Sequence, residues 1–233
     1  MKKLLKRIVI LLLVIVFVCF AVLTGHGYLM YRDALQQQGL SDRAVEIQSN
    51  PNYTPISDLP EMYLDAVVAV EDHRFTQHFG IDLISIGRAT WNNLTSWSLQ
   101  EGGSTITQQL AKNLYFTQEK SFIRKIAEMF MAFNLERTYE KDEILELYVN
   151  SIYFGNGYYC VRSASLGYFG KKPISMGDYE CTLLAGIPNA PSVYSLAANP
   201  ELAQQRQQFV IRQMVRYGYI SETEGETIID QQP

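Results

Sequence analysis

The residues of this sequence that are best suited to chemistry lie between positions 66 and 125. An apolar run there ends on the acidic pair Glu71-Asp72, a break at Gly102-Gly103 opens a polar segment, and the cations Arg124-Lys125 follow. A positioned carboxylate can take a proton from a nucleophile, and clustered cations can neutralise an anionic leaving group. This succession of groups predicts proton abstraction beside an anionic leaving group.

Glu71 is expected at the end of an amphipathic helix. Apolar side chains recur at helical spacing just before it, at Met62, Tyr63, Ala66, Val67 and Val70. A glutamate at the end of such a helix is commonly a solvated surface residue. The helix alone therefore leaves a structural and a catalytic interpretation of Glu71 open.

Two further helices are expected to carry polar groups. Ser104 or Thr105 can cap the first, which would present Gln108, Gln109 and Lys112 in successive turns. Glycine-rich turns and helix N-termini offer N–H groups to anions, although many such turns bind nothing. The second covers residues 121–136 and places Arg124 and Glu128 on one face, where a surface ion pair is the simplest interpretation. The side of this second helix expected to be buried consists of Phe122, Ile126, Phe130 and Phe133.

The composition fits one globular domain with an appendage. The chain has 233 residues, of which 47% are hydrophobic and 19% charged. A net charge of -4 argues against non-specific nucleic-acid binding. Three cysteines without paired spacing make neither a zinc site nor a disulfide framework, and a single disulfide between Cys160 and Cys181 stays open.

The N-terminal segment predicts a membrane anchor. Positions 8–31 carry no Asp, Glu, Lys or Arg, which is long enough for the roughly 20 residues of a spanning helix. A cleaved signal peptide is the alternative, but its apolar region is roughly 7–15 residues long and ends at an A-x-A-like site that is missing here. The cations before this segment should stay in the cytoplasm, with the remainder of the chain outside.

The remainder is predicted to be all-α. Residues 33–57 are polar and indicate a stalk with turns. Beyond them, helical patterns recur at 142–148, 164–169, 180–187, 204–217 and 222–229, with a turn at 155–157 and no alternating strand pattern. Residues 81–99 are apolar and include Trp91, Leu94 and Trp97, so a core helix and a membrane-interface segment both fit.

Several blocks, taken together, resemble the motifs of the bacterial peptidoglycan glycosyltransferases. They are EDHRFTQHFGID at 71–82, GGSTITQQLAKN at 102–113, RKIAE at 124–128, KDEILELYVN at 141–150 with YFG at 153–155, and ASLGYFGK at 164–171. Motifs of this length in the family's order are far more specific than any single one. The sequence departs from the family's pattern at Cys160, where relatives often have glycine, and at Leu196, where proline is common.

The resemblance implies a lysozyme-like all-α fold with a larger head lobe and a small jaw that dips into the membrane. The family that the chain resembles is glycosyltransferase family 51. Because the sequence ends at Pro233, there is no room for a transpeptidase module. We therefore expect the monofunctional type, related to the N-terminal module of class A penicillin-binding proteins. The expected division is a cytoplasmic tip and transmembrane anchor at 1–31, a stalk at 32–56 and the glycosyltransferase domain at 57–233. The jaw is expected at about 79–101, which favours the membrane-interface interpretation of 81–99.

The activity implied by the resemblance is polymerisation of lipid II into glycan strands. The GlcNAc 4-hydroxyl of an incoming lipid II attacks the growing chain, undecaprenyl pyrophosphate departs, and the configuration inverts. Motif matching makes Glu71 the catalytic base and Glu128 the second catalytic glutamate, which orients a cation or a metal or assists the leaving group. The expected ligands of sugar and pyrophosphate are Ser104, Gln108, Gln109, Lys112, Asn113, Lys120, Arg124 and Lys125.

No cofactor and no protein metal site is expected, while a divalent cation, Mg²⁺ or Mn²⁺, stays open. The expected partners are lipid II, the growing glycan strand and membrane lipids, with penicillin-binding proteins or other cell-wall synthesis proteins as candidates and no nucleic acid. The expected location is the bacterial cytoplasmic membrane, crossed once. The rival functions are a lysozyme-like enzyme that cleaves peptidoglycan, acting with carboxylates across the scissile bond, and an inactive membrane scaffold.

Overall fold

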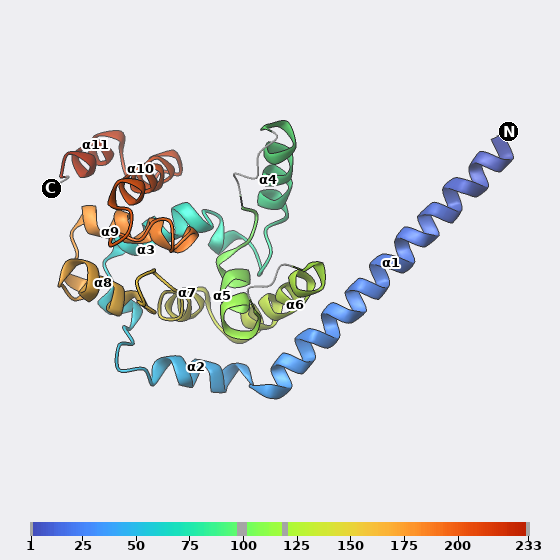
Figure 1. Cartoon of the computed structure of the whole chain (residues 1–233), viewed down its shortest axis with the longest axis horizontal. Helices are drawn as coiled ribbons and strands as arrows, with labels where there is room; N and C mark the ends of the chain where they lie inside the picture. Colours follow the sequence, from blue (N-terminus) through green and yellow to red (C-terminus); the bar gives the residue numbers. More distant parts are fainter. Residues whose placement is uncertain (1, 97–101, 118–120, 232–233) are drawn as a thin grey trace.

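The computed structural model describes residues 2–96, 102–117 and 121–231. Within these ranges the chain forms α-helices and short 3-10 segments, with two isolated bridges and no β-strand. The all-α, lysozyme-like prediction is confirmed (Figure 1). The α-helices are α1 (Lys2–Gln37), α2 (Leu40–Gln48), α3 (Glu61–Glu71), α4 (Leu83–Ser96), α5 (Ile106–Tyr115), α6 (Phe122–Thr138), α7 (Lys141–Val149), α8 (Val161–Phe169), α9 (Asp178–Gly186), α10 (Pro200–Arg216) and α11 (Glu222–Asp230).

One hydrophobic core joins two groups of helices. Helices α3, α9 and α10 pack against one another, and α5 packs against both α6 and α7. The apolar face predicted for α3 is largely buried, with Tyr63, Ala66 and Val67 inside the core. The two groups meet where α3 ends and α5 begins, which is the region of the predicted chemistry.

The junction between α3 and α5 is held by hydrogen bonds. Asp72, directly after α3, is buried, and its Oδ2 accepts a hydrogen bond from the backbone N–H of Ile106 at 3.0 Å. The same carboxylate oxygen lies 2.9 Å from Nε2 of His78. The hydroxyl of Thr105 donates to the carbonyl oxygen of Gly80 at 2.7 Å. The end of α3, the following loop and the start of α5 therefore form one fixed unit.

Helix α4 stands out from the body of the protein (Figure 1). Asp82 caps its start by accepting hydrogen bonds from the backbone of Ile84 and Ser85. The core-helix interpretation of this segment is wrong for Leu83 and Trp91, which are 76% and 67% exposed. The side chain of Leu94 and all of Trp97 lie outside the described residues.

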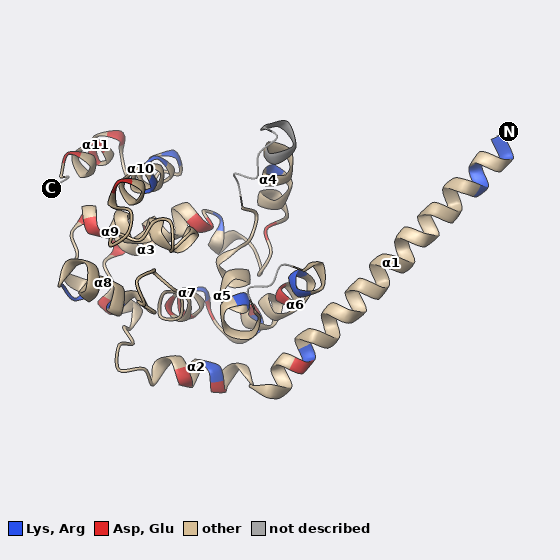
Figure 2. Ribbon diagram, viewed as in Figure 1, with Lys and Arg blue, Asp and Glu red and all other residues tan. Residues whose placement is uncertain are grey.

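Helix α1 is a single rod that leaves the body in one direction (Figure 1). It is long and apolar enough to cross a membrane, and its most apolar stretch is not buried against the rest of the chain. Figure 2 shows cations at its N-terminal tip and then no charged residue until it nears the body. The C-terminal part of α1 packs on α6, where the ring centroids of Tyr28 and Phe130 are 5.3 Å apart.

Two expectations about this region were wrong. Residues 33–57 were expected to form a stalk with turns, and turns do occur at 49–52, but α1 continues to Gln37, α2 follows, and Ala44 of α2 is buried in the core. Polar residues that favour helices fill this segment, so polarity alone was a poor indicator of turns. The buried side expected for α6 was also wrong, because Phe122 is 84% exposed while Met131 and Leu135 are buried. Helix α6 packs on α5 and α1 at once, so no single apolar stripe defines its inner face.

The later helices agree with the sequence patterns. Helices α7 to α11 lie over the predicted segments, although α9 and α10 each end one residue earlier than predicted, and Gly155 and Gly157 adopt positive φ angles in the predicted turn. Cys160 and Cys181 are both free thiols. Cys160 has φ 72° and ψ 154°, a backbone conformation that favours glycine. A cysteine at this position therefore has a strained backbone.

The close approach of α1 to α6 at Gly27 yields a first prediction. A Cβ atom at Gly27 would lie 2.5 Å from Cγ2 of Ile126 and 3.1 Å from the carbonyl oxygen of Ile123. Gly27→Ala should therefore lower the melting temperature of the full chain in detergent, since overpacking of this kind costs about 1–3 kcal/mol. Gly25→Ala is the matched control, because nothing lies within 4 Å of a Cβ there. Equal melting temperatures for the two variants would contradict the observed packing of α1 on α6.

Candidate active site

Glu71 is the last residue of α3, and its carboxylate points toward α5. Its Oε2 accepts a hydrogen bond from Nε2 of Gln109 at 2.7 Å. Its Oε1 is buried and has no hydrogen-bond partner among the described residues. The interpretation of Glu71 as an ordinary solvated residue is therefore wrong, because one carboxylate oxygen is buried and the other accepts a hydrogen bond from Gln109.

Burial raises the pKa of Glu71 above its ordinary value. The hydrogen bond from Gln109 and the positive charges of Arg206 and Lys112 act in the opposite direction, while the neighbouring Asp72 raises the pKa further. Desolvation disfavours a charged carboxylate, so a raised pKa makes it a stronger proton acceptor. These are the properties that a general base needs.

The polar residues predicted on helix α5 differ in their hydrogen bonds and in their exposure. Of the two candidate caps, Thr105 is the cap, and it exchanges hydrogen bonds of 3.1 Å with Gln108 in a capping box. Gln108 is buried and occupied by this role, so it does not face the same space as Gln109. Asn113 is partly exposed on the last turn of α5.

Lys112 lies between the glutamate and the cations. It has no ion-pair or hydrogen-bond partner within the described part of the chain. Burial lowers the pKa of its ammonium group, and Arg124 and Lys125 act in the same direction, while Glu128 and Glu71 oppose them. A partly buried lysine without a partner favours an anion beside it, because its charge has lost part of its hydration.

Glu128 on α6 is buried and holds two cations. Its Oε1 lies 2.9 Å from Nε of Arg124, and its Oε2 lies 3.0 Å from Nζ of Lys125. Lys125 also donates to the hydroxyl of Ser104 at 2.6 Å, and Arg124 donates to the carbonyl oxygen of Thr117 at 2.9 Å. The expected Arg124–Glu128 pair is thus present, but its carboxylate is buried. Lys120 lies outside the described residues.

Two residues near Glu71 were missed by the sequence analysis. Arg206 on α10 is close enough for its charge to act on Glu71, and its Nε is buried with no hydrogen-bond partner within the described ranges. Its guanidinium carbon lies 4.7 Å from the centre of the Phe209 ring. Tyr148 on α7 is fully buried and donates to Oε1 of Gln109 at 3.0 Å. Arg206 is one of three arginines on α10, and nothing in the sequence separates it from the other two or separates Tyr148 from an ordinary core tyrosine.

No group of three or more His, Cys, Asp or Glu side chains suited to a metal ion occurs among the described residues. The two oxygens of Glu128 already contact cations, so the site does not offer a ready set of metal ligands.

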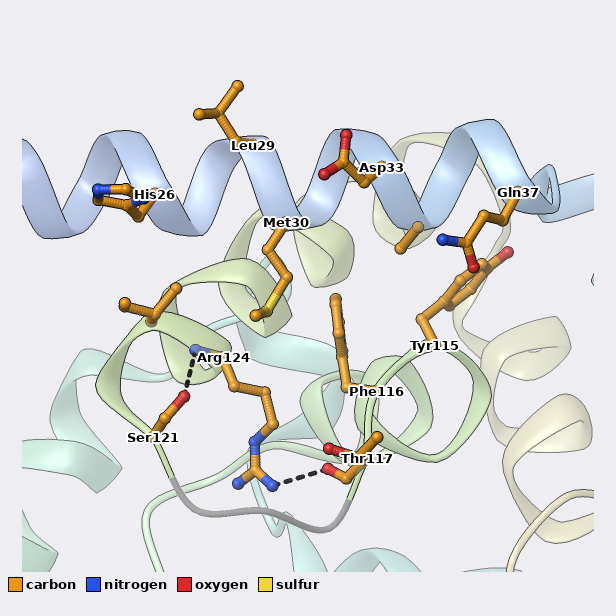
Figure 3. A pocket seen from close by; sticks show the side chains of 12 residues that line it. His26, Leu29, Met30, Asp33, Gln37, Tyr115, Phe116, Thr117, Ser121 and Arg124 are labelled. Atoms are coloured by element: carbon orange, nitrogen blue, oxygen red, sulfur yellow. Dashed lines mark hydrogen bonds between the residues drawn. The ribbon is translucent and has the colours of Figure 1, made fainter.

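A groove of about 600 Å³ separates α1 from the connection between α5 and α6. Figure 3 shows Met30 of α1 and Phe116 directed into this groove, with Arg124 farther from α1. Its other apolar lining residues include Leu29 and Ile123. Because Arg124 lines the groove and also contacts Glu128, the groove adjoins the cation cluster.

The chain matches the family model described as transglycosylase over residues 39–215. It is 45% identical to penicillin-binding protein 1F of Bacillus subtilis over 172 residues, which cover 74% of this chain and 24% of that protein. The chain therefore spans about a quarter of that relative's length. A protein of Cupriavidus necator assigned as a transglycosylase is 43% identical over 183 residues, covering 78% of this chain and 79% of the relative.

A crystal structure of penicillin-binding protein 1A from Haemophilus influenzae aligns with a TM-score of 0.47 and 22% identity, over 78% of this chain and 17% of that one. The family assignment depends instead on the sequence matches. The transglycosylase model covers more than half of the chain, and the Cupriavidus necator protein is matched over most of its own length. The chain therefore belongs to the transglycosylase family.

Proposed function

We propose that this protein is a peptidoglycan glycosyltransferase that polymerises lipid II into glycan strands. The observation that carries the proposal is a buried oxygen of Glu71 that has no hydrogen-bond partner among the described residues, together with the partly buried cation Lys112 on the facing helix, whose charge acts on Glu71. A base and a cation side by side suit an attack by a hydroxyl on a carbon that bears an anionic leaving group. Relatives named as transglycosylase or penicillin-binding protein support this choice of reaction.

In the proposed reaction, the 4-hydroxyl oxygen of the acceptor GlcNAc attacks the anomeric carbon of the donor's MurNAc. The hydroxyl proton passes to Oε1 of Glu71, and the bond from the anomeric carbon to the pyrophosphate oxygen breaks. The pyrophosphate departs with the bonding electrons, and the α linkage becomes β. Oε2 of Glu71 already accepts a hydrogen bond from Gln109, so Oε1 is the oxygen that takes the proton.

The leaving pyrophosphate needs charge neutralisation more than it needs a proton. Lys112, Arg124 and Lys125 supply positive charge from α5 and α6, and we assign the pyrophosphate to them. Glu128 keeps Arg124 and Lys125 in place and lowers their tendency to repel each other. A divalent cation, if it takes part, would arrive with the pyrophosphate.

The rival function of peptidoglycan cleavage fits these contacts less well. Glycoside hydrolases generally use one carboxyl group as an acid, kept protonated by its surroundings. The second carboxylate here, Glu128, contacts Arg124 with one oxygen and Lys125 with the other, so neither oxygen is left free to face a scissile bond. A polymer substrate without pyrophosphate would also have no use for these cations.

The membrane arrangement follows from the same proposal. Helix α1 would cross the cytoplasmic membrane with its N-terminal cations inside, and the exposed apolar residues of α4 would enter the outer surface of the bilayer. The groove between α1 and the α5–α6 connection would receive the start of the donor's polyprenyl chain. Its apolar lining and its shared Arg124 support that position, because the chain is covalently attached to the pyrophosphate.

Replacing the base should abolish polymerisation without unfolding the protein. Glu71→Gln keeps the size of the side chain but cannot accept the proton, so we expect the rate to fall by about 10²–10⁴-fold. The measurement is conversion of labelled lipid II to muramidase-sensitive polymer in detergent. Lipid II binding and the melting temperature serve as controls, and a variant with the parent's turnover would remove Glu71 from this role.

Replacing Lys112 should weaken binding of the anionic part of the substrate. Lys112→Ala is expected to reduce both polymerisation and the affinity for moenomycin, a phosphate-bearing inhibitor, while Lys112→Arg keeps part of both. Binding of pyrophosphate-free glycan is the control and should hardly change. Lys172→Ala, at an exposed position far along the chain, is the matched cation control. If Lys112→Ala polymerises like the parent and binds the inhibitor normally, Lys112 is only a helix residue.

Filling the groove should affect long lipid tails selectively. Met30→Trp places a larger side chain in the groove, so polymerisation of lipid II with a full-length polyprenyl chain should slow more than that of a short-chain analogue. Leu12→Trp, on an exposed part of α1 outside the groove, is the control and should leave the ratio of the two rates unchanged. Equal slowing of both substrates by Met30→Trp would argue against a tail in this groove.

A further inference from the structure

We infer that Tyr148 is a positioning residue for the reaction: through Gln109 it fixes which oxygen of Glu71 is free to take the proton. The inference rests on the proposed function, because it concerns the base of that reaction. It is carried by a chain of two hydrogen bonds that runs from α7 through α5 to the end of α3. The Tyr148 hydroxyl lies 3.0 Å from Oε1 of Gln109, and Nε2 of Gln109 lies 2.7 Å from Oε2 of Glu71.

The direction of these bonds is set by chemistry. An ionised carboxylate can only accept hydrogen bonds, so Gln109 must turn its NH₂ group toward Glu71. The amide oxygen then faces Tyr148, which must donate its hydroxyl hydrogen. Only one orientation of the Gln109 amide satisfies both ends while Glu71 is ionised, and the Tyr148 hydroxyl is what makes the other orientation unfavourable.

The fixed amide determines where the proton can go. Oε2 of Glu71 accepts a hydrogen bond from Gln109, while no described residue is a hydrogen-bond partner of the buried Oε1. Without the Tyr148 hydroxyl, the amide oxygen of Gln109 loses its donor and the amide can turn over. Its oxygen would then face the carboxylate, which favours the protonated form of Glu71 and blocks its use as a base.

Other groups around Glu71 stay in place when only this hydroxyl is removed. Lys112 faces it from α5, Arg206 from α10, and Asp72 is its neighbour in the chain. Their charges are the same in the parent and in Tyr148→Phe. A change in the pH dependence of that variant is therefore attributable to the hydrogen-bond chain.

The protein contains a matched control for this hydroxyl. Tyr63 on α3 is also fully buried, but its hydroxyl has no hydrogen-bond partner in the part of the chain that the structure describes. Tyr63→Phe and Tyr148→Phe thus remove the same atom from the same kind of surroundings. Only Tyr148→Phe breaks the connection to Glu71.

The test is the pH profile of kcat/KM for lipid II polymerisation by the full chain in detergent. The base must be ionised, so the rate rises as pH increases through the pKa of Glu71. We expect Tyr148→Phe to move this acid limb upward by about half to one pH unit, the shift that corresponds to one lost hydrogen bond. Tyr63→Phe should keep the parent's profile. Lowered activity of Tyr148→Phe at every pH, without a moved limb, would overturn the inference and leave a packing role.

A second variant, Gln109→Ala, keeps the inference testable if Tyr148→Phe fails to fold. It also tests whether Tyr148 acts on Glu71 through Gln109. Gln109→Ala should move the acid limb in the same direction, and adding Tyr148→Phe to it should cause no further shift. Additive shifts would mean that Tyr148 acts independently of Gln109, which contradicts the inference.

Glu71→Gln distinguishes a failure of the proposed function from a failure of this inference. If Glu71→Gln still polymerises lipid II, the proposed function fails; if it is inactive while Tyr148→Phe keeps the parent's profile, only this inference fails.

Discussion

The buried carboxylate of Asp72 is the constraint on which the candidate site depends. It holds the first N–H group of α5 and contacts His78, so the end of α3, the loop and α5 cannot move separately. A buried acceptor that lost these partners would be costly, which makes the arrangement stiff. Since Glu71 is the residue before Asp72 and Gln109 and Lys112 lie on α5, one contact sets the distances within the base and cation pair.

The electrostatics of the site follow from this rigid junction. Burial alone would raise the pKa of Glu71 and lower that of Lys112, and each charge partly offsets the effect on the other. The result is a carboxylate that remains basic and an ammonium that lacks a permanent partner. A more exposed pair would bind each other or water and lose both properties, because solvent screens their charges.

The sequence predicted the elements of the site better than its contacts. The fold class, the helix that bears Glu71, the capped helix α5 and the Arg124–Glu128 pair were all predicted, because they depend on local spacing. The capping role of Gln108 was not separated from ligand binding, since a glutamine at that position can do either. Tyr148, Arg206 and the exposed Phe122 depend on how α6, α7 and α10 pack against other helices, and helical periodicity does not contain that information.

The contacts of Glu128 reduce the number of roles that the sequence motif allowed for this residue. The resemblance allowed this residue to orient a cation, to hold a metal or to assist the leaving group. In the structure each of its oxygens lies within 3.0 Å of a cationic nitrogen, and the side chain is buried. Both oxygens are thus occupied, so a metal or a leaving group would have to displace one of the two cations to reach the carboxylate. The geometry therefore favours the first role, in which Glu128 keeps Arg124 and Lys125 together so that a multivalent anion meets them at fixed positions.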